Sequence, residues 1–186
     1  MVIDKLKQLG LYESTLICIT GDHGESLGEH DETTHGYFVY DATVRVPLVM
    51  KVPGEKKGIR LNSAVGLVDI VPAICSLLDI KLSSPVQGKD ISPYLLQDEP
   101  VDLQRHVFTE SLIPTKYKCN SLLALVSDHY KYIQTTRPEL YDMIEDPMET
   151  NNLIDQDPNL LARNPESKRA RMLQGRLQQI IERTIN

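Results

Sequence analysis

The chain has 186 residues, of which 41% are hydrophobic, and its formal net charge is −6 at pH 7. This acidic balance argues against nucleic acid as a partner, because nucleic-acid binding calls for a basic face. No apolar run approaches the roughly 20 residues that cross a bilayer and no signal peptide is evident, so we expect no membrane span, and the composition leaves the localisation open.

The first half of the chain alternates between helix and strand patterns. Helical spacing of apolar residues predicts a helix over Val2–Leu9. The short β-branched run Leu16–Ile19 predicts a strand buried on both faces, as in a parallel sheet covered by helices. Val46–Val52 predicts a second strand, and the nearly all-apolar stretch Val65–Leu78 predicts a buried helix. A further short helix is expected to begin at Asp90.

The pattern changes after residues 97–102, an acidic stretch with a proline that we take as a candidate boundary. From there on the sequence predicts short strands and then one long helix. The expected strands are His106–Leu112, Leu122–Val126, Tyr130–Gln134 and Glu139–Met143. The helix is expected from Ser167 to near the end of the chain.

A possible site follows the first predicted strand. Asp22 and His23 come directly after Gly21, where ligand sites of open α/β sheets are found. A carboxylate and an imidazole can both donate to one divalent cation, although two ligands do not complete a shell. Taken alone, Gly21–Gly24 is more typical of a polar turn after a strand than of a metal site.

The surrounding motifs point to a family. The segments Gly21–Glu25, His35–Phe38 and Arg45–Val49 follow one another in that order. The late segments Glu139–Asp142 and Asp146–Leu153 read Glu-Leu-Tyr-Asp and Asp-Pro-x-Glu-x-Asn-Asn-Leu. Together, over nearly the whole chain, they resemble the second half of a sulfatase of the alkaline-phosphatase superfamily.

The resemblance implies an architecture. It implies an α/β fold, the C-terminal part of an alkaline-phosphatase-like α/β/α sandwich followed by a small antiparallel sheet with a terminal helix. Residues 1–97 would then belong to the main domain, with a metal-site loop at residues 21–36. Residues 103–186 would form the small α+β subdomain.

The resemblance also implies roles for three residues. Asp22 and His23 match positions that complete a divalent-metal site, commonly calcium, and His35 matches a sulfate-contacting Lys or His about a dozen positions later. An imidazole suits manganese or zinc better than calcium, so the metal stays open. His30, among acidic neighbours, is the rival of His35 as an anion contact.

The sulfatase nucleophile has no counterpart in the chain. Sulfatases carry a Cys-x-Pro-x-Arg or Ser-x-Pro-x-Arg segment whose first residue becomes formylglycine. None of the three cysteines, Cys18, Cys75 and Cys119, begins such a segment. We therefore expect formylglycine in a missing N-terminal half of the same protein, and a chain that is inactive alone.

Three functions remain open at this point. The first is a sulfatase portion acting on a sulfated small molecule or carbohydrate. The second is a phosphodiesterase, phosphonate monoester hydrolase or phosphoethanolamine transferase of the same superfamily, because phosphate and sulfate groups share a tetrahedral shape. The third is a non-catalytic binding module that keeps the fold.

Overall fold

The computed structural model describes residues 1–55, 58–96, 105–127, 129–154 and 165–185. Contacts within the chain group it into two compact units. The first comprises residues 1–22, 46–62 and 66–102, and the second comprises residues 23–45, 63–65 and 103–186. The candidate boundary at 97–102 lies outside the described residues, and the division into domains at 1–97 and 103–186 stays a prediction.

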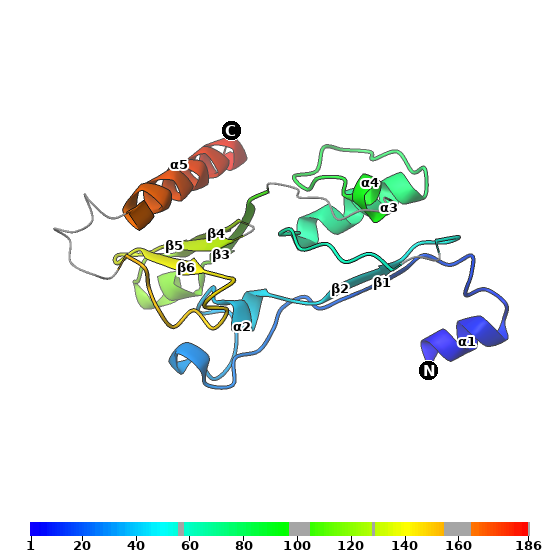
Figure 1. Cartoon of the computed structure of the whole chain (residues 1–186), viewed down its shortest axis with the longest axis horizontal. Helices are drawn as coiled ribbons and strands as arrows, with labels where there is room; N and C mark the ends of the chain where they lie inside the picture. The colour runs from blue at the N-terminus through cyan, green and yellow to red at the C-terminus, as the bar shows by residue number, and fades with distance from the viewer. Residues whose placement is uncertain (56–57, 97–104, 128, 155–164, 186) are drawn as a thin grey trace. The chain divides into compact units, whose positions relative to one another are not determined.

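The first unit contains a two-stranded sheet. Helix α1 (Val2–Gln8) precedes strand β1 (Ile17–Thr20), which pairs with β2 (Leu48–Lys51) (Figure 1). The pairing is antiparallel, with Ile19 opposite Val49, and these side chains are 53% and 58% exposed. The prediction of a strand buried on both faces in a parallel sheet is therefore wrong, because within the described residues β1 has a single, antiparallel neighbour.

The helices of the first unit are short. A 3-10 turn at Leu67–Asp69 leads into α3 (Ile70–Leu77), which contacts α4 (Ser92–Leu95). The fully buried Asp69 accepts hydrogen bonds from the backbone N–H groups of Gly66 and Lys89, at 2.8 and 2.7 Å, and so ties two loops together. The predicted helix is present, but its all-round burial is wrong, since Val71 is 54% exposed.

The second unit is built on a four-stranded antiparallel sheet in the order β3-β4-β5-β6. All four predicted strands are confirmed to within two residues at each end. Their bounds are Val107–Ser111, Leu122–Val126, Tyr130–Gln134 and Glu139–Asp142. The residues Ser127-Asp128-His129 predict a hairpin turn between β4 and β5, but Asp128 lies outside the described residues.

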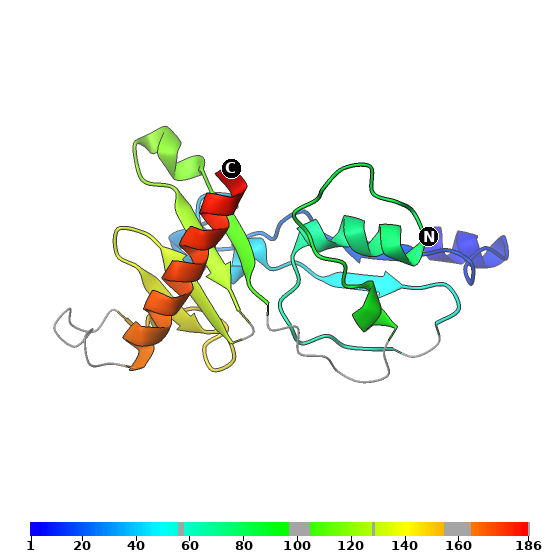
Figure 2. The same cartoon turned by 90° about the horizontal axis from the view of Figure 1, so that it is seen from above.

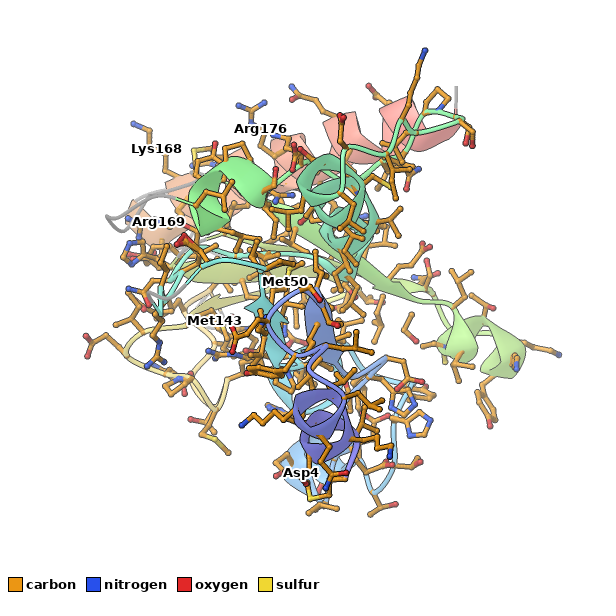
Figure 3. All side chains as sticks on the ribbon, turned by 90° about the vertical axis from the view of Figure 1, so that its right-hand side faces the viewer. Asp4, Met50, Met143, Lys168, Arg169 and Arg176 are labelled. Atoms are coloured by element: carbon orange, nitrogen blue, oxygen red, sulfur yellow. The ribbon has the colours of Figure 1, made fainter. Side chains whose placement is uncertain are left out.

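Helix α5 (Pro165–Ile185) covers one face of this sheet (Figure 2). Leu173 and Leu177 pack against Leu125 and Leu140, all at most 1% exposed. On the outer side of α5, the exposed side chains of Lys168 and Arg176 project away from the ribbon (Figure 3). The predicted arrangement of a small antiparallel sheet with a terminal helix is confirmed.

The opposite face of the sheet holds the segment that follows the predicted site. Because strand side chains alternate between faces, Ala124 and Ile133 point away from α5. They form a second core with Val39 and Tyr141. Residues Asp41–Val44 form the short helix α2 beside this core. None of the described helices combines the length and apolar character needed to cross a membrane.

Candidate functional site

The predicted site residues lie on an irregular loop that docks against α2. The backbone N–H of Gly24 donates to the carbonyl oxygen of Thr43 at 2.8 Å. A Cβ at position 24 would lie only 2.3 Å from the carbonyl oxygen of Ala42. Only glycine permits this approach, so the fold fixes the loop immediately after His23.

His23 and His35 lie side by side. Their rings stack with centroids 3.8 Å apart and an interplanar angle of 24°. His35 Nδ1 lies 3.1 and 3.2 Å from the two carboxylate oxygens of Glu25, with both side chains about half exposed. His23 Nδ1 lies 2.7 Å from the carbonyl oxygen of Gly24. In each ring the Nδ1 edge therefore faces an oxygen acceptor.

The Glu25 contact sets the orientation of His35. A carboxylate that accepts from Nδ1 holds the imidazole in one direction and leaves Nε2 as its outward nitrogen. This role of Glu25 is not predicted from the sequence. Ten positions separate the two residues along an irregular loop, and no periodic pattern links them.

Asp22 is exposed and stands at the end of the first unit, one residue before His23 begins the second. Its carboxylate and an imidazole are suitable donors for a divalent cation, with oxygen favouring calcium and nitrogen favouring manganese or zinc. Within the described ranges, no three His, Cys, Asp or Glu side chains group closely enough to hold a metal. These donors fit part of a metal shell and not a whole one.

The rival, His30, is occupied by contacts within the fold. Its ring stacks on Tyr40 with centroids 3.6 Å apart, and Nε2 donates to the carbonyl oxygen of Met148 at 3.1 Å. The neighbouring Glu29 accepts hydrogen bonds from the Leu27 N–H and the Ser26 hydroxyl. Hydrogen bonds from the backbone N–H groups of Glu29 and Leu27, with that from Ser26, lower the Glu29 pKa. His30 and Glu29 therefore stabilise the conformation of the loop.

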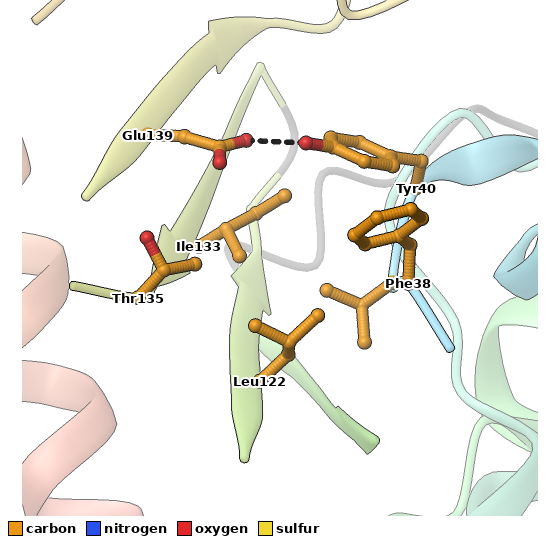
Figure 4. Close-up of a pocket in the computed structure, with 7 residues that line it drawn as sticks. Phe38, Tyr40, Leu122, Ile133, Thr135 and Glu139 are labelled. Carbon is orange, nitrogen blue, oxygen red and sulfur yellow. Dashed lines mark hydrogen bonds between the residues drawn. The ribbon is translucent and has the colours of Figure 1, made fainter. Parts of the chain in front are cut away.

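A hollow opens beside Tyr37, and we name it the Tyr37 hollow. Its volume is about 250 Å³, and its lining combines aromatic rings with hydroxyl, amide and carboxylate groups: Tyr37, Phe38, Pro114, Cys119, Asn120, Leu122, Thr135, Thr136 and Glu139. A smaller hollow of about 40 Å³ shares four of these residues, Phe38, Leu122, Thr135 and Glu139 (Figure 4). Such a lining suits a polar ring-shaped ligand with apolar faces.

The carboxylate of Glu139 is held in place by two tyrosines. The hydroxyls of Tyr40 and Tyr141 both donate to Glu139 Oε2 at 2.8 Å. Burial, assisted by the negative charge of Glu139, raises the pKa of both phenols above the usual range. They therefore stay protonated as donors, and Glu139 is fixed as an acceptor at the edge of the hollow.

Comparison with known proteins gives a consistent answer. The family described as N-sulphoglucosamine sulphohydrolase, C-terminal, matches residues 28–178. An ulvan-active sulfatase from Formosa agariphila is 29% identical over 160 residues, which cover 83% of this chain and 31% of that protein.

Solved structures share the fold. One is a protein in complex with its substrate D-glucosamine-2-N,6-O-disulfate, with a TM-score of 0.75 and 22% identity over 97% of this chain and 37% of that one. Another is a phosphonate monoester hydrolase from Silicibacter pomeroyi, with a TM-score of 0.70 and 25% identity over 95% of this chain and 37% of that one.

The chain thus spans about a third of the length of these relatives. The family match extends over most of the chain and includes His30, His35, α2, the whole four-stranded sheet and most of α5. The chain belongs to the sulfatase family, in the region described as N-sulphoglucosamine sulphohydrolase, C-terminal.

Proposed function

We propose that this chain acts as the C-terminal region of a metal-dependent sulfatase, a sulfuric ester hydrolase. Asp22 and His23 contribute part of the shell of a divalent metal, and His35 contacts the sulfate group. The observation that carries the proposal is the stacked pair of His23 and His35 with Glu25 on Nδ1 of His35. The nucleophile and the other ligands come from the portion of a sulfatase that this chain does not span.

His35 acts on the sulfate through Nε2. With Glu25 holding Nδ1, the imidazolium donates a charge-assisted hydrogen bond to a sulfate oxygen or to the bridging oxygen. A bound divalent metal supplies positive charge that stabilises the negative oxygens of the transition state. Loss of the His35 contact removes about 2 to 4 kcal/mol of transition-state stabilisation.

Calcium is the metal that we propose first, on the family resemblance. The nitrogen of His23 also suits manganese or zinc. Metal analysis of the sulfatase that contains this chain, after mild dialysis, decides between them. Retention of zinc or manganese in place of calcium overturns the calcium assignment.

The proposed substrate is a sulfated carbohydrate. The relative from Formosa agariphila is named for activity on ulvan, and one structural neighbour was solved with a disulfated glucosamine. The Tyr37 hollow adds a chemical argument, because aromatic rings pack on sugar faces while Asn120, Thr136 and Glu139 can bind hydroxyls.

A phosphonate monoester hydrolase is the second candidate. The likeness to the Silicibacter pomeroyi enzyme favours it, and phosphonate and sulfate esters present similar tetrahedral anions. The relative turnover of an aryl sulfate and an aryl phosphonate ester by the enzyme that contains this chain discriminates between the candidates. Faster turnover of the sulfate supports the sulfatase.

The test is an assay of the sulfatase that contains this chain on an aryl sulfate. We expect Asp22→Asn and His35→Ala each to lower turnover by about 30- to 1,000-fold while the thermal unfolding midpoint is kept. Asp31→Asn, an exposed carboxylate of the same loop, is the matched control. Near-normal rates in the first two variants overturn the proposed roles. The 186-residue chain alone is expected to show no turnover.

A further inference from the structure

Lys131 carries a charge in the interior of the second unit. Its side chain is 0% exposed, and its Nζ lies 2.9 Å from Asp41 Oδ1 and 2.8 Å from Glu149 Oε1. The Asp41 and Glu149 side chains are 16% and 1% exposed. Buried charges are costly unless they are paired, so these three groups depend on one another. We name them the Lys131 cluster.

The Lys131 cluster joins three segments that are far apart in the sequence. Asp41 is the first residue of α2, Lys131 lies in β5, and Glu149 belongs to the late Asp-Pro-x-Glu segment. Glu149 also accepts a hydrogen bond from the backbone N–H of Asp41, at 2.6 Å. Its φ of +55° is in the left-handed region that non-glycine residues rarely adopt. Glu149 thus adopts an uncommon backbone conformation at the position from which its carboxylate contacts Asp41.

A second set of contacts ties the same segments together. His30 stacks on Tyr40, and its Nε2 donates to the carbonyl oxygen of Met148, next to Glu149. The Tyr40 hydroxyl donates to Glu139 at 2.8 Å. The segment 30–41 is therefore bound near each of its ends to the stretch 139–149, through His30 at one end and Tyr40 at the other.

From the Lys131 cluster, a short chain of contacts leads to the candidate site. The cluster fixes Asp41 and thereby α2. Gly24 docks on α2 through its hydrogen bond to Thr43 and its close approach to Ala42. His23 is the neighbour of Gly24 and stacks on His35.

We propose that Lys131 and Glu149 are positioning residues that hold α2 in place, so that the Gly24 contact keeps His23 stacked against His35. This inference rests on the proposed function of His35. The inference assigns a positioning role to Glu149 of the late Asp-Pro-x-Glu segment, although more than 110 positions separate this residue from His35. Neither residue touches the substrate, and both act through α2.

The test compares local and global order in the 186-residue chain. The variant is the double substitution Lys131→Met with Glu149→Gln, which removes one charge of each sign and keeps an amide oxygen for the Asp41 N–H. Lys116→Met, at an exposed lysine, is the control. NMR measures the amide hydrogen exchange of Gly24 and Ser26 and the nuclear Overhauser effect between the His23 and His35 rings.

We expect the double variant to speed exchange at Gly24 and Ser26 by about tenfold or more and to lose the ring-to-ring Overhauser effect. Exchange at Leu125 and Tyr132, in the sheet, is expected to stay within about threefold of the parent chain. If exchange speeds up equally in the loop and in the sheet, the two residues have a merely structural role or the variant fails to fold, and the inference is overturned. Unchanged exchange at Gly24 and Ser26 also overturns it.

The measurement needs neither metal nor substrate. It therefore fails or succeeds independently of the roles of Asp22 and His35 in turnover. A selective loosening of the loop, combined with normal activity of the His35→Ala enzyme, keeps the positioning mechanism and removes its proposed catalytic purpose.

Discussion

The two units of the molecule bury their apolar residues very differently. In the second unit, the four-stranded sheet and a 21-residue helix enclose one cluster, in which Leu125, Leu140 and Leu177 have no exposed surface, and a second cluster lies on the opposite face of the sheet. Among the described residues of the first unit, the hydrophobic side chains that are buried are those of Ala73 and Ile91. Large side chains such as Ile19, Val49 and Val71 are more than half exposed there.

This contrast shows where the order of the candidate site originates. Residues 23–45 group with the well-packed unit, and Val39 lies inside its second core. The loop that carries His23 and His35 thus depends on the small sheet and not only on the strand that precedes it. A motif next to one strand can owe its geometry to a sheet that follows much later in the sequence.

The largest expected effect contrasts the two units directly. Leu177→Ala removes a fully buried side chain from between α5 and the sheet and should cost about 2 to 5 kcal/mol of unfolding free energy. Leu78→Ala, at a side chain that is 46% exposed, should cost less than about 1 kcal/mol. Urea unfolding followed by circular dichroism measures both. Equal losses would mean that the first unit is packed as tightly as the second.

A smaller effect is expected where the loop meets α2. Gly24→Ala forces a Cβ against the backbone of Ala42 and Thr43, which cannot yield as a side chain can, and should destabilise the chain by about 1 to 3 kcal/mol. Gly175→Ala in α5 is the control, because its Cβ meets no atom within 4 Å. It should stabilise the helix by about 1 kcal/mol. The contact with α2 is unimportant if both variants unfold at the same urea concentration.

The smallest effect appears only at high pH. Burial and the hydrogen bonds to Glu139 raise the pKa values of Tyr40 and Tyr141 above the 10.0 of an ordinary phenol, so at high pH the folded state keeps protons that the unfolded state has lost. Their contribution to stability is full below pH 10 and is lost as the pH rises beyond it. Tyr40→Phe should therefore make the fall in unfolding free energy between pH 9 and pH 11 shallower, as measured by urea unfolding at each pH.

The control for the pH series is Tyr117→Phe, at a ring that is 68% exposed. It should keep the steepness of the parent chain. An identical slope in the Tyr40→Phe variant would show that ionisation of this phenol is not coupled to unfolding.

Local pattern was enough to predict the four strands of the small sheet and the helix that covers it, and the family resemblance implied their antiparallel arrangement. A short apolar run places Leu122–Val126, and alternation places Tyr130–Gln134, at their observed bounds. Antiparallel neighbours joined by short turns need little more than local information. The pairing of β1 could not be predicted in this way, because an apolar run of four residues does not reveal how many strands flank it.

The candidate site was predictable only in part. Family motifs singled out Asp22, His23 and His35, and the fold stacks the two imidazoles. The contacts that hold them depend on long-range packing: Glu25 reaches His35 across an irregular loop, and Lys131 reaches Asp41 from another element. Neither partner stands at a spacing that a helix or a strand would repeat.

Cys119 provides a natural attachment point for an optical reporter. It is exposed and lines the Tyr37 hollow, whereas Cys18 and Cys75 are half-buried and burial raises the pKa of the Cys18 thiol. Maleimide dyes react with thiolates, so coupling should favour Cys119. If the proposed sugar binds in the Tyr37 hollow, a fluorophore placed there without any substitution would change its emission.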